Sequence, residues 1–322
     1  MEATKKKRFF KGYSAFEKRD FLFVYLLIAL PVIQFAVFWL YVNFSSFLLA
    51  FQTPQGQFTL GNFAEVITTM RVGDGEGFKF FEMLGRSLTL WGVSNLLAFP
   101  ISLATTYVLY KRVTGHYVFR ICYLVPSLVG SVVWAAMVKQ LFEFNGPVIY
   151  ILKSLGINFN YTVLHQGLFS DASTAFPSLV IMSFMLGFVG GSAVLTGAYA
   201  RISDELFEVG KLDGINFWRE FFCVALPCAW PTIATLITFS LCSIFLADGN
   251  VFVYTNGTGK PEMSTMGFYI YYKVYRISQS SNVNELPYGY VSAVGMFLTA
   301  MTLPVVLIGK WLLEKVSEPV EN

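Results

Sequence analysis

The side chains most able to do chemistry in this sequence are four carboxylates that lie close together, Asp204, Glu205, Glu208 and Asp213. Clustered carboxylates can hold a metal ion or act as acid and base in an enzyme. They also suit a short surface helix, because acidic side chains are favourable in its first turn and Glu208 can pair with Lys211 three positions later. The short helix and the turn that follows it account for all four carboxylates, and the sequence therefore predicts no catalytic residue.

The histidines and cysteines do not extend this cluster into a metal site. His116 and His165 lie in loops that the topology below places on opposite sides of a membrane, and Cys223 and Cys228 are five positions apart, not three as in a redox pair. A phosphate-binding Gly-x-x-x-x-Gly-Lys-Ser/Thr sequence is also absent. We expect this chain to bind no metal and no cofactor of its own.

The elements that must position these residues are mostly apolar. The chain has 322 residues, of which 55% are hydrophobic and 13% are charged, and its mean hydropathy is +0.57. A soluble domain carries about 25% charged residues, so the composition excludes a soluble enzyme, a disordered protein and a nucleic-acid binder. Six stretches are each long enough to cross a bilayer as a helix. They lie at about 21–42, 87–110, 117–138, 176–200, 225–247 and 287–310. The sequence thus predicts an all-α integral membrane protein with six transmembrane helices.

Lysine and arginine are distributed unevenly between the loops. Fifteen lie on the side of the chain termini, seven of them in the first 20 residues, and eight lie in the longer loops on the other side. Because basic residues favour the cytoplasmic side, both termini are predicted to be cytoplasmic. The predicted organisation is a basic tail at 1–20, a six-span domain at 21–313 and a second cytoplasmic tail at 314–322.

The loop at 201–226, between the fourth and fifth spans, reads as two short helices. Ser203 is predicted to cap the first helix, and Asp213-Gly214 supplies a sharp turn in which the glycine can take a positive φ. A second amphipathic helix then ends before Pro227. The aromatic residues Phe207, Phe217 and Trp218 are expected to be exposed. They could rest on lipid headgroups or enter a groove of a cytoplasmic partner, and the pattern alone leaves both readings open.

This loop resembles the EAA loop of ATP-binding-cassette (ABC) importer permeases. The residues that match at the family's spacing are Glu208, Asp213, Gly214, Leu226 and Pro227. The sequence departs from the pattern at Val209 and Gly210, where the family has alanines, and at Ile215. The resemblance implies that Glu208 fixes the loop electrostatically, that Gly214 permits its bend and that the three aromatic residues fill a groove on an ATPase.

Further segments resemble the maltose-type (MalF-like) carbohydrate permeases. These are residues 202–208, residues 250–257 followed by Pro261, and residues 60–63. The resemblance implies the type I importer fold in a bacterial cell membrane. It also implies that the chain is half of a pore completed by a second, related permease. Two cytoplasmic ATPases would bind ATP and Mg²⁺, and an extracytoplasmic binding protein would deliver an oligosaccharide. This chain would contact lipid but no nucleic acid, and would not itself be an enzyme.

The same resemblance implies a substrate path between the fourth and fifth spans. Leu186, Gly187 and Ser240 match family positions that face the sugar. Ser183 stands where a maltose permease has Asn, Gly190 where it has Tyr, and Ile244 where it has Asn. These substitutions argue against maltose itself as the substrate.

Three other functions remain as alternatives. An importer of another solute is the first, because EAA loops also occur in peptide and ion permeases. A polytopic membrane enzyme would need clustered acidic or histidine residues at one membrane face. A secondary transporter would need charged residues inside the spans, and the uncharged stretches contain none.

Overall fold

The computed structural model describes residues 15–111, 113, 115–143, 146–156, 167–247, 250–257, 259–279 and 288–316. Most of both predicted tails, namely residues 1–14 and 317–322, lies outside the described residues. Apart from one isolated antiparallel bridge between Gln52 and Phe58, every regular element in the described part is helical. The predicted all-α class is confirmed.

Nineteen helical elements follow one another along the described chain. They are α1 (Ala15–Gln34), the π-helical η1 (Phe35–Tyr41), α2 (Val42–Leu49), α3 (Gly61–Val72), α4 (Phe80–Gly92), the π-helical η2 (Val93–Ala98), α5 (Phe99–Tyr110), α6 (His116–Leu128), α7 (Ser131–Phe142), α8 (Pro147–Ser154), α10 (Ala172–Val189), α11 (Ser192–Tyr199), α12 (Asp204–Leu212), α13 (Phe217–Glu220), the π-helical η3 (Phe221–Ala225), α14 (Leu226–Cys242), α15 (Val251–Thr255), α16 (Met266–Gln279) and α17 (Tyr288–Val316).

Several of these elements join into helices that are long and apolar enough to cross a membrane. Among the described residues, five continuous helices qualify: Phe23–Leu49, Phe80–Tyr110, Ala172–Tyr199, Phe217–Cys242 and Tyr288–Lys315. A sixth span results if His116–Leu128 and Ser131–Ser154 are taken together. The uncharged stretches predict six spans, and the described residues hold five continuous helices of this kind, or six if the bent pair is counted as one span.

The predicted continuous span at 117–138 is wrong in one respect, because the helix is broken. Its two halves meet at an angle of 108°. Val129 and Gly130 both have extended backbone, with ψ angles of 133° and 141°. Pro126 lies just before this break and removes one backbone N–H from the helix. The lack of charged residues from 121 to 138 identified an apolar segment, but it could not show this local change of backbone direction.

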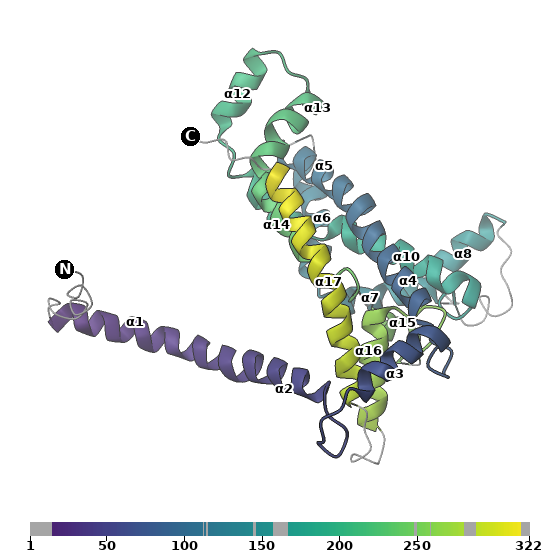
Figure 1. The fold of residues 1–322 in the computed structure, drawn as a ribbon. Coiled ribbons are helices and arrows are strands. Elements are labelled where there is room, and N and C mark those ends of the chain that lie inside the picture. The colour runs from purple at the N-terminus through teal and green to yellow at the C-terminus, as the bar shows by residue number, and fades with distance from the viewer. Residues whose placement is uncertain are drawn as a thin grey trace.

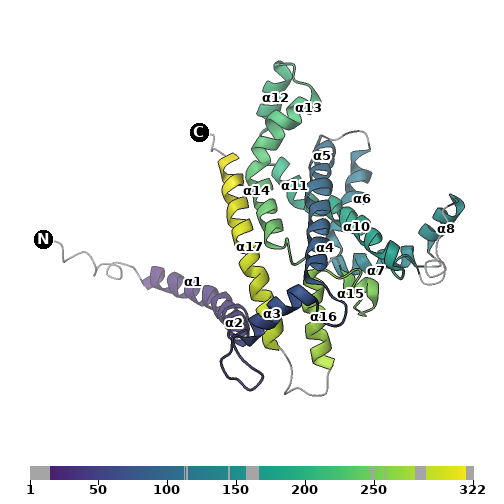
Figure 2. The same ribbon diagram turned by 45° about the vertical axis from the view of Figure 1, so that its right-hand side comes forward.

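The first span lies apart from the rest of the bundle. α1, η1 and α2 form one long helix that leaves the other helices at a wide angle and meets them only at its C-terminal end (Figures 1 and 2). Its apolar side chains are exposed within this chain, with Phe38 72% exposed. At its end, α2 contacts α17, and the Phe51 ring packs on Phe63 of the following helix with centroids 5.1 Å apart.

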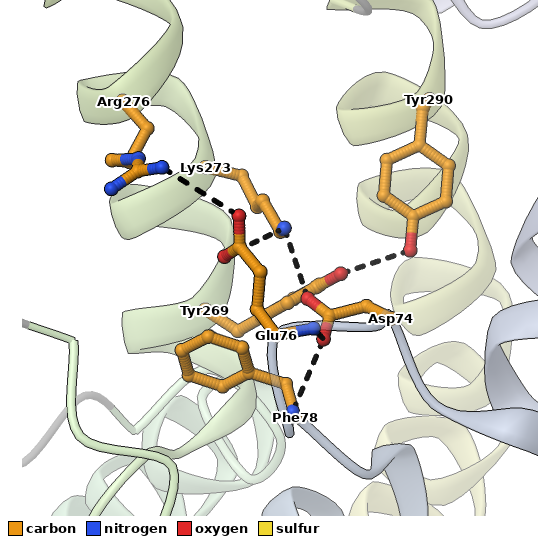
Figure 3. Close-up of polar contacts among 7 residues, drawn as sticks. All are labelled: Asp74, Glu76, Phe78, Tyr269, Lys273, Arg276 and Tyr290. Atoms are coloured by element: carbon orange, nitrogen blue, oxygen red, sulfur yellow. Dashed lines mark hydrogen bonds and ion pairs between the residues drawn. The ribbon is translucent and has the colours of Figure 1, made fainter.

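At the end of the bundle that carries α3, α15 and α16, an ion-pair cluster joins the loop between α3 and α4 to α16 (Figure 3). The Asp74 carboxylate accepts hydrogen bonds from the backbone N–H groups of Glu76 and Phe78, at 3.0 and 3.1 Å. Lys273 of α16 pairs with Asp74 at 2.9 Å and with Glu76 at 3.2 Å. Burial alone would lower the pKa of Lys273, but the two carboxylates outweigh it and raise that pKa above its usual value. This ammonium group therefore stays charged and ties the loop before α4 to α16.

The opposite end of the bundle carries α12 and α13, which project beyond the ends of the long helices (Figure 1). We call residues 204–220, which comprise these two helices and their turn, the α12–α13 hairpin. A second hydrophobic core, centred on Tyr107, Tyr199 and Phe221, lies beneath it. The hairpin is therefore seated on this core by its base, and its tip is free of the bundle.

Candidate coupling and translocation site

The turn of the α12–α13 hairpin closes α12 with a Schellman motif. Gly214 has a φ of +67°, as the Asp213-Gly214 pair predicts. The Ile215 N–H donates to the Gly210 carbonyl and the Gly214 N–H donates to the Lys211 carbonyl, both at 3.1 Å. These two bonds satisfy carbonyls that the helix end would otherwise leave unpaired. Asn216 then caps α13, its side chain accepting from the Phe217 N–H at 2.7 Å.

Two departures from the EAA pattern, Gly210 and Ile215, fit one another. Gly210 is buried, and a Cβ atom placed on it would lie 2.6 Å from the Ile215 Cδ1 atom. The Ile215 side chain thus occupies the space that an alanine methyl group would need. The larger residue after the turn is accommodated by the smaller one within α12.

This fit predicts a compensating pair of substitutions. Gly210→Ala should destabilise the hairpin by about 1 kcal/mol, since overpacking outweighs the helix propensity that alanine gains. Gly210→Ala combined with Ile215→Ala should recover most of that loss, because the clashing atom is gone. Proteolytic nicking at 201–226 in detergent-solubilised chain would measure local opening, with Val209→Ala as the control. Equal nicking of the single and the double variant would contradict the fit.

The aromatic residues of the hairpin do not all lie where the sequence predicts. Phe207 was expected to be exposed, but it is only 5% exposed and packs on Tyr110 at the end of α5, with ring centroids 6.0 Å apart. Phe217 is half-buried against Tyr107, at 5.3 Å. Trp218 is 56% exposed, in agreement with the prediction. The prediction failed for Phe207 because the α12 face that carries it turns back onto α5.

The other residues singled out in the loop are at its surface or at its base. Glu208, Asp213 and Lys211 are exposed, and no ion pair joins Glu208 to Lys211 in the described structure. Leu226 and Pro227 begin α14, which continues from the π-helical η3 inside the unbroken Phe217–Cys242 helix, so Pro227 removes one backbone N–H within that helix. Ser203 takes the capping position of α12, but its side chain makes no capping hydrogen bond.

A polar network joins the middle of the Phe80–Tyr110 helix to Ser240, which lies near the C-terminal end of α14. The Trp91 Nε1–H donates to the Ser240 carbonyl at 2.9 Å and approaches the Ser240 hydroxyl at 2.8 Å. The Ser240 hydroxyl donates to Asn95 Oδ1 at 2.5 Å, and Asn95 Nδ2 donates to the Trp91 carbonyl at 3.0 Å. Asn95 belongs to η2, and such π-helical segments often occur at functional sites.

On the other side of η2, α10 approaches very closely. The Ser94 hydroxyl donates to the Ser183 carbonyl at 2.9 Å. A Cβ atom on Gly187 would lie 2.8 to 2.9 Å from the Cα, Cβ and O atoms of Ser94. A cavity of about 170 Å³ lies beside this contact, and Asn95, Gly187 and Gly190 are among its lining residues. η2 therefore brings polar groups from α10 and α14 to a single region within the membrane span.

Residues 97–318 match the family described as "Binding-protein-dependent transport system inner membrane component". This match covers more than half of the chain. The chain belongs to this family. It is accordingly a multi-pass protein of the bacterial inner membrane.

Individual relatives in this family are similar over most of the chain. The "Probable ABC transporter permease protein YesP" of Bacillus subtilis (strain 168) is 25% identical over 300 residues, which are 90% of each protein. The "Lactose transport system permease protein LacF" of Rhizobium radiobacter is 25% identical over 263 residues, 80% of this chain and 84% of the relative.

A solved structure has the same fold. It is the "Crystal structure of a bacterial ABC transporter involved in the import of the acidic polysaccharide alginate", of which one chain aligns with a TM-score of 0.72 and 22% sequence identity. The alignment covers 94% of this chain and 98% of that chain. The predicted importer-permease fold is confirmed.

Within this family fold, the six residues predicted to line a substrate path fall into two groups. Ser183, Gly187 and Ser240 are joined through η2, and Gly190 lines the cavity beside it. Leu186 is half-buried nearby in α10. Ile244, by contrast, is 6% exposed within the hydrophobic core toward the α16 end and is not among the residues that line that cavity.

Sequence reasoning missed Trp91 and Asn95. Both lie in the stretch predicted as the second span, where an asparagine and a tryptophan four positions apart share one helix face. That spacing was the available signal, because an amide inside a span needs a partner. The identity of the partner, Ser240, could not be read from it.

Proposed function

We propose that this chain is the membrane-spanning permease subunit of an ATP-driven carbohydrate importer, in which it forms half of the translocation pore. The observation that carries the proposal is the projecting α12–α13 hairpin, with its EAA-like residues, inside the segment that matches the family. Such a permease couples substrate passage to ATP hydrolysis on other subunits. ATP and Mg²⁺ would bind those ATPases, and this chain would contribute no catalytic residue.

The hairpin tip has the character of a docking surface for an ATPase. Leu212 is 87% exposed at the end of α12, and Val209 and Trp218 are also exposed. Exposed apolar side chains on a short projecting helix suit a groove in a partner protein. Gly214 sets the angle between the two helices, and the Glu208 carboxylate beside this surface is free to engage a basic group there. With Phe207 buried, the apolar contact with the partner falls to Leu212 and Trp218.

The first span supports a second permease as partner. The α1–η1–α2 helix leaves the bundle with its apolar side chains uncovered by this chain (Figures 1 and 2). Lipid can cover such a helix, but helices of one permease commonly associate through close packing in the membrane. We propose that this arm packs on a related, non-identical permease that completes the pore. An extracytoplasmic binding protein would dock at the end that carries α3, α15 and α16.

The network around η2 supports carbohydrate as the substrate. Asparagine offers two donors and two acceptor sites, and Asn95 uses one of each within the chain. One donor and one acceptor therefore remain for a ligand in the adjoining cavity. Hydroxyl-rich sugars match such paired amide groups, and several relatives carry sugar names, including "Arabinooligosaccharides transport system permease protein AraP" of Bacillus subtilis (strain 168).

Site-directed crosslinking tests the coupling role. In a background whose four cysteines are replaced by serine, Leu212→Cys should crosslink to a Walker-motif ATPase in the native membrane. Phe58→Cys, which is also strongly exposed but lies in the outer loop at the other end, is the control and should not. If Leu212→Cys reacts with membrane-embedded reagents but forms no crosslink to an ATPase, the hairpin rests on the membrane surface.

Substitution of Asn95 tests the substrate role. Asn95→Leu should raise the apparent KM for carbohydrate uptake roughly 5- to 30-fold, since one to two hydrogen bonds of about 1 kcal/mol each are lost. Uptake of labelled di- and trisaccharides into proteoliposomes holding the complete importer measures this. Thr89→Val is the matched control, because Thr89 is exposed on the same helix and bonds only its own Gly85 carbonyl. A normal KM in Asn95→Leu would place the path elsewhere.

A further inference from the structure

An ion pair with a buried carboxylate and a partly buried ammonium group fastens the α12–α13 hairpin to the end of α5. The Lys111 ammonium at the C-cap of α5 pairs with the Glu220 carboxylate at the end of α13, 109 positions later. Glu220 is 7% exposed, and it is the buried residue of α13. The Lys111 Nζ atom also lies 3.7 Å from the centroid of the Phe207 ring in α12. One ammonium group thus touches both helices of the hairpin and the helix beneath them.

Two connections join the hairpin to the bundle. α13 continues without a break into the Phe217–Cys242 helix. In α12 only Phe207 and Gly210 are buried, and Gly210 faces Ile215 within the hairpin itself. The junction of Lys111, Glu220 and Phe207 is therefore the contact through which a force on the tip at Leu212 would reach the end of α5.

The helix that receives this force is continuous as far as the polar network. Residues Phe80–Tyr110 form one helix of 31 residues through α4, η2 and α5. Ser94 and Asn95 lie on it, in contact with α10 and α14. A displacement at Lys111 can reach Asn95 along this single element, because a continuous helix is one of the structures that carry coupling between distant sites.

Stability alone is a weak reason for a buried ion pair at this junction. Desolvation of two charges offsets much of their attraction, and well-packed apolar residues often stabilise as well. The surrounding Tyr107 and Phe221 rings, 5.1 Å apart between centroids, already pack together without the charges. Beyond packing, the ion pair fixes the position of α13 relative to the end of α5, because either charge left alone in this site is strongly unfavourable.

We propose that Lys111 and Glu220 are positioning residues that make the α12–α13 hairpin and the Phe80–Tyr110 helix move as one body. The mechanical link follows from the contacts of this chain, and its part in coupling rests on the proposed importer function. The pair transmits motion of the hairpin tip to the Asn95–Ser240 contact. Without the pair, the hairpin can tilt on its base while the long helix stays in place.

Pulsed EPR on the full-length chain in nanodiscs measures the link directly. Spin labels at Leu212 and Leu97, both exposed, report the distance between the tip and η2 in a cysteine-free background. The parent chain should give one narrow distance distribution, and Lys111→Met and Glu220→Gln should each at least double its width. Lys111→Arg, which keeps the charge, should retain the narrow distribution, and Lys111→Glu with Glu220→Lys should restore it. An unchanged width in both single variants overturns the proposal.

A transport measurement separates positioning from a merely structural role. In proteoliposomes holding the complete importer, Lys111→Met and Glu220→Gln should lower carbohydrate uptake per ATP hydrolysed at least tenfold, while ATPase subunits still co-purify. Lys310→Met removes the exposed Lys310–Glu314 pair on α17 and should leave the ratio unchanged. Wild-type ratios in both variants would also overturn the proposal. If the parent importer moves no carbohydrate, the proposed function fails, and the distance widths still decide the mechanical link.

Discussion

Replacing Gly214 with valine is expected to lower carbohydrate uptake at least about tenfold while the chain still inserts into the membrane, a loss that corresponds to roughly 1.4 kcal/mol in the barrier to transport. Gly214 has a φ of +67°, which a β-branched residue adopts only with strain. The left-handed conformation costs an L-residue roughly 1–2 kcal/mol, and relief of this strain would open the turn. The tip at Leu212 would then point away from its proposed groove. Uptake and ATP hydrolysis measured together on the reconstituted importer would show hydrolysis without transport.

Two control variants separate this effect from general strain. Gly214→Asn should keep most of the uptake, because asparagine tolerates positive φ better than other side chains. Gly56→Val imposes the same strain at a φ of +78°, and at both glycines a Cβ atom would meet nothing within 4 Å. Gly56 lies in the loop between α2 and α3, at the end of the bundle opposite the hairpin, so this variant should transport normally. Wild-type uptake in Gly214→Val, or equal losses in Gly56→Val, would contradict the role of the turn.

The parts of the fold that could be predicted from the sequence are those that depend on local properties. Stretches without charged residues identify membrane helices, because a bilayer excludes charge regardless of tertiary contacts. The turn at Asp213-Gly214 was predicted for the same reason, since backbone freedom belongs to the glycine itself. The resemblance to permeases then supplied the arrangement of the helices, and the fold match confirms it. The domain boundaries at 21 and 313 and the partner-binding role of the hairpin remain predictions.

What could not be predicted depends on contacts between distant positions. Phe207 is buried because Lys111 and Tyr110 lie beside it, and nothing in residues 201–226 reveals this. Asn95 accepts a hydrogen bond from Ser240, 145 positions later. The α16 helix was missed because it is not an uncharged stretch: it includes Lys273, whose charge is satisfied by the distant Asp74. In each case a polar or aromatic residue is explained by a partner that the local pattern does not contain.

The glycines of the fourth span have two different surroundings. Small residues in a membrane span allow close contact between helices. Gly187 lies where α10 and η2 touch, whereas Gly190 lines the cavity next to this contact. A substitution at Gly187 should therefore act first through packing.

Gly187→Ala is accordingly expected to destabilise the chain by about 1–3 kcal/mol, the usual cost of overpacking a tight contact. The added methyl group would lie 2.8 Å from the Ser94 Cα atom and 2.9 Å from its carbonyl oxygen. Backbone atoms cannot rotate away as a flexible side chain can, so α10 and η2 must separate. That separation would also stretch the 2.9 Å hydrogen bond from Ser94 to Ser183. The half-life of the detergent-solubilised chain on heating should fall correspondingly.

Gly197→Ala is the matched control for this substitution. Gly197 lies in α11 of the same span, and a Cβ atom there would meet nothing within 4 Å. Alanine should therefore be neutral or stabilise the helix by up to about 1 kcal/mol. Equal half-lives for Gly187→Ala and the parent would mean that the two helices can part without cost. The η2 contact would then be a movable gate next to the cavity, and Asn95 would be exposed to a substrate whenever that gate opens.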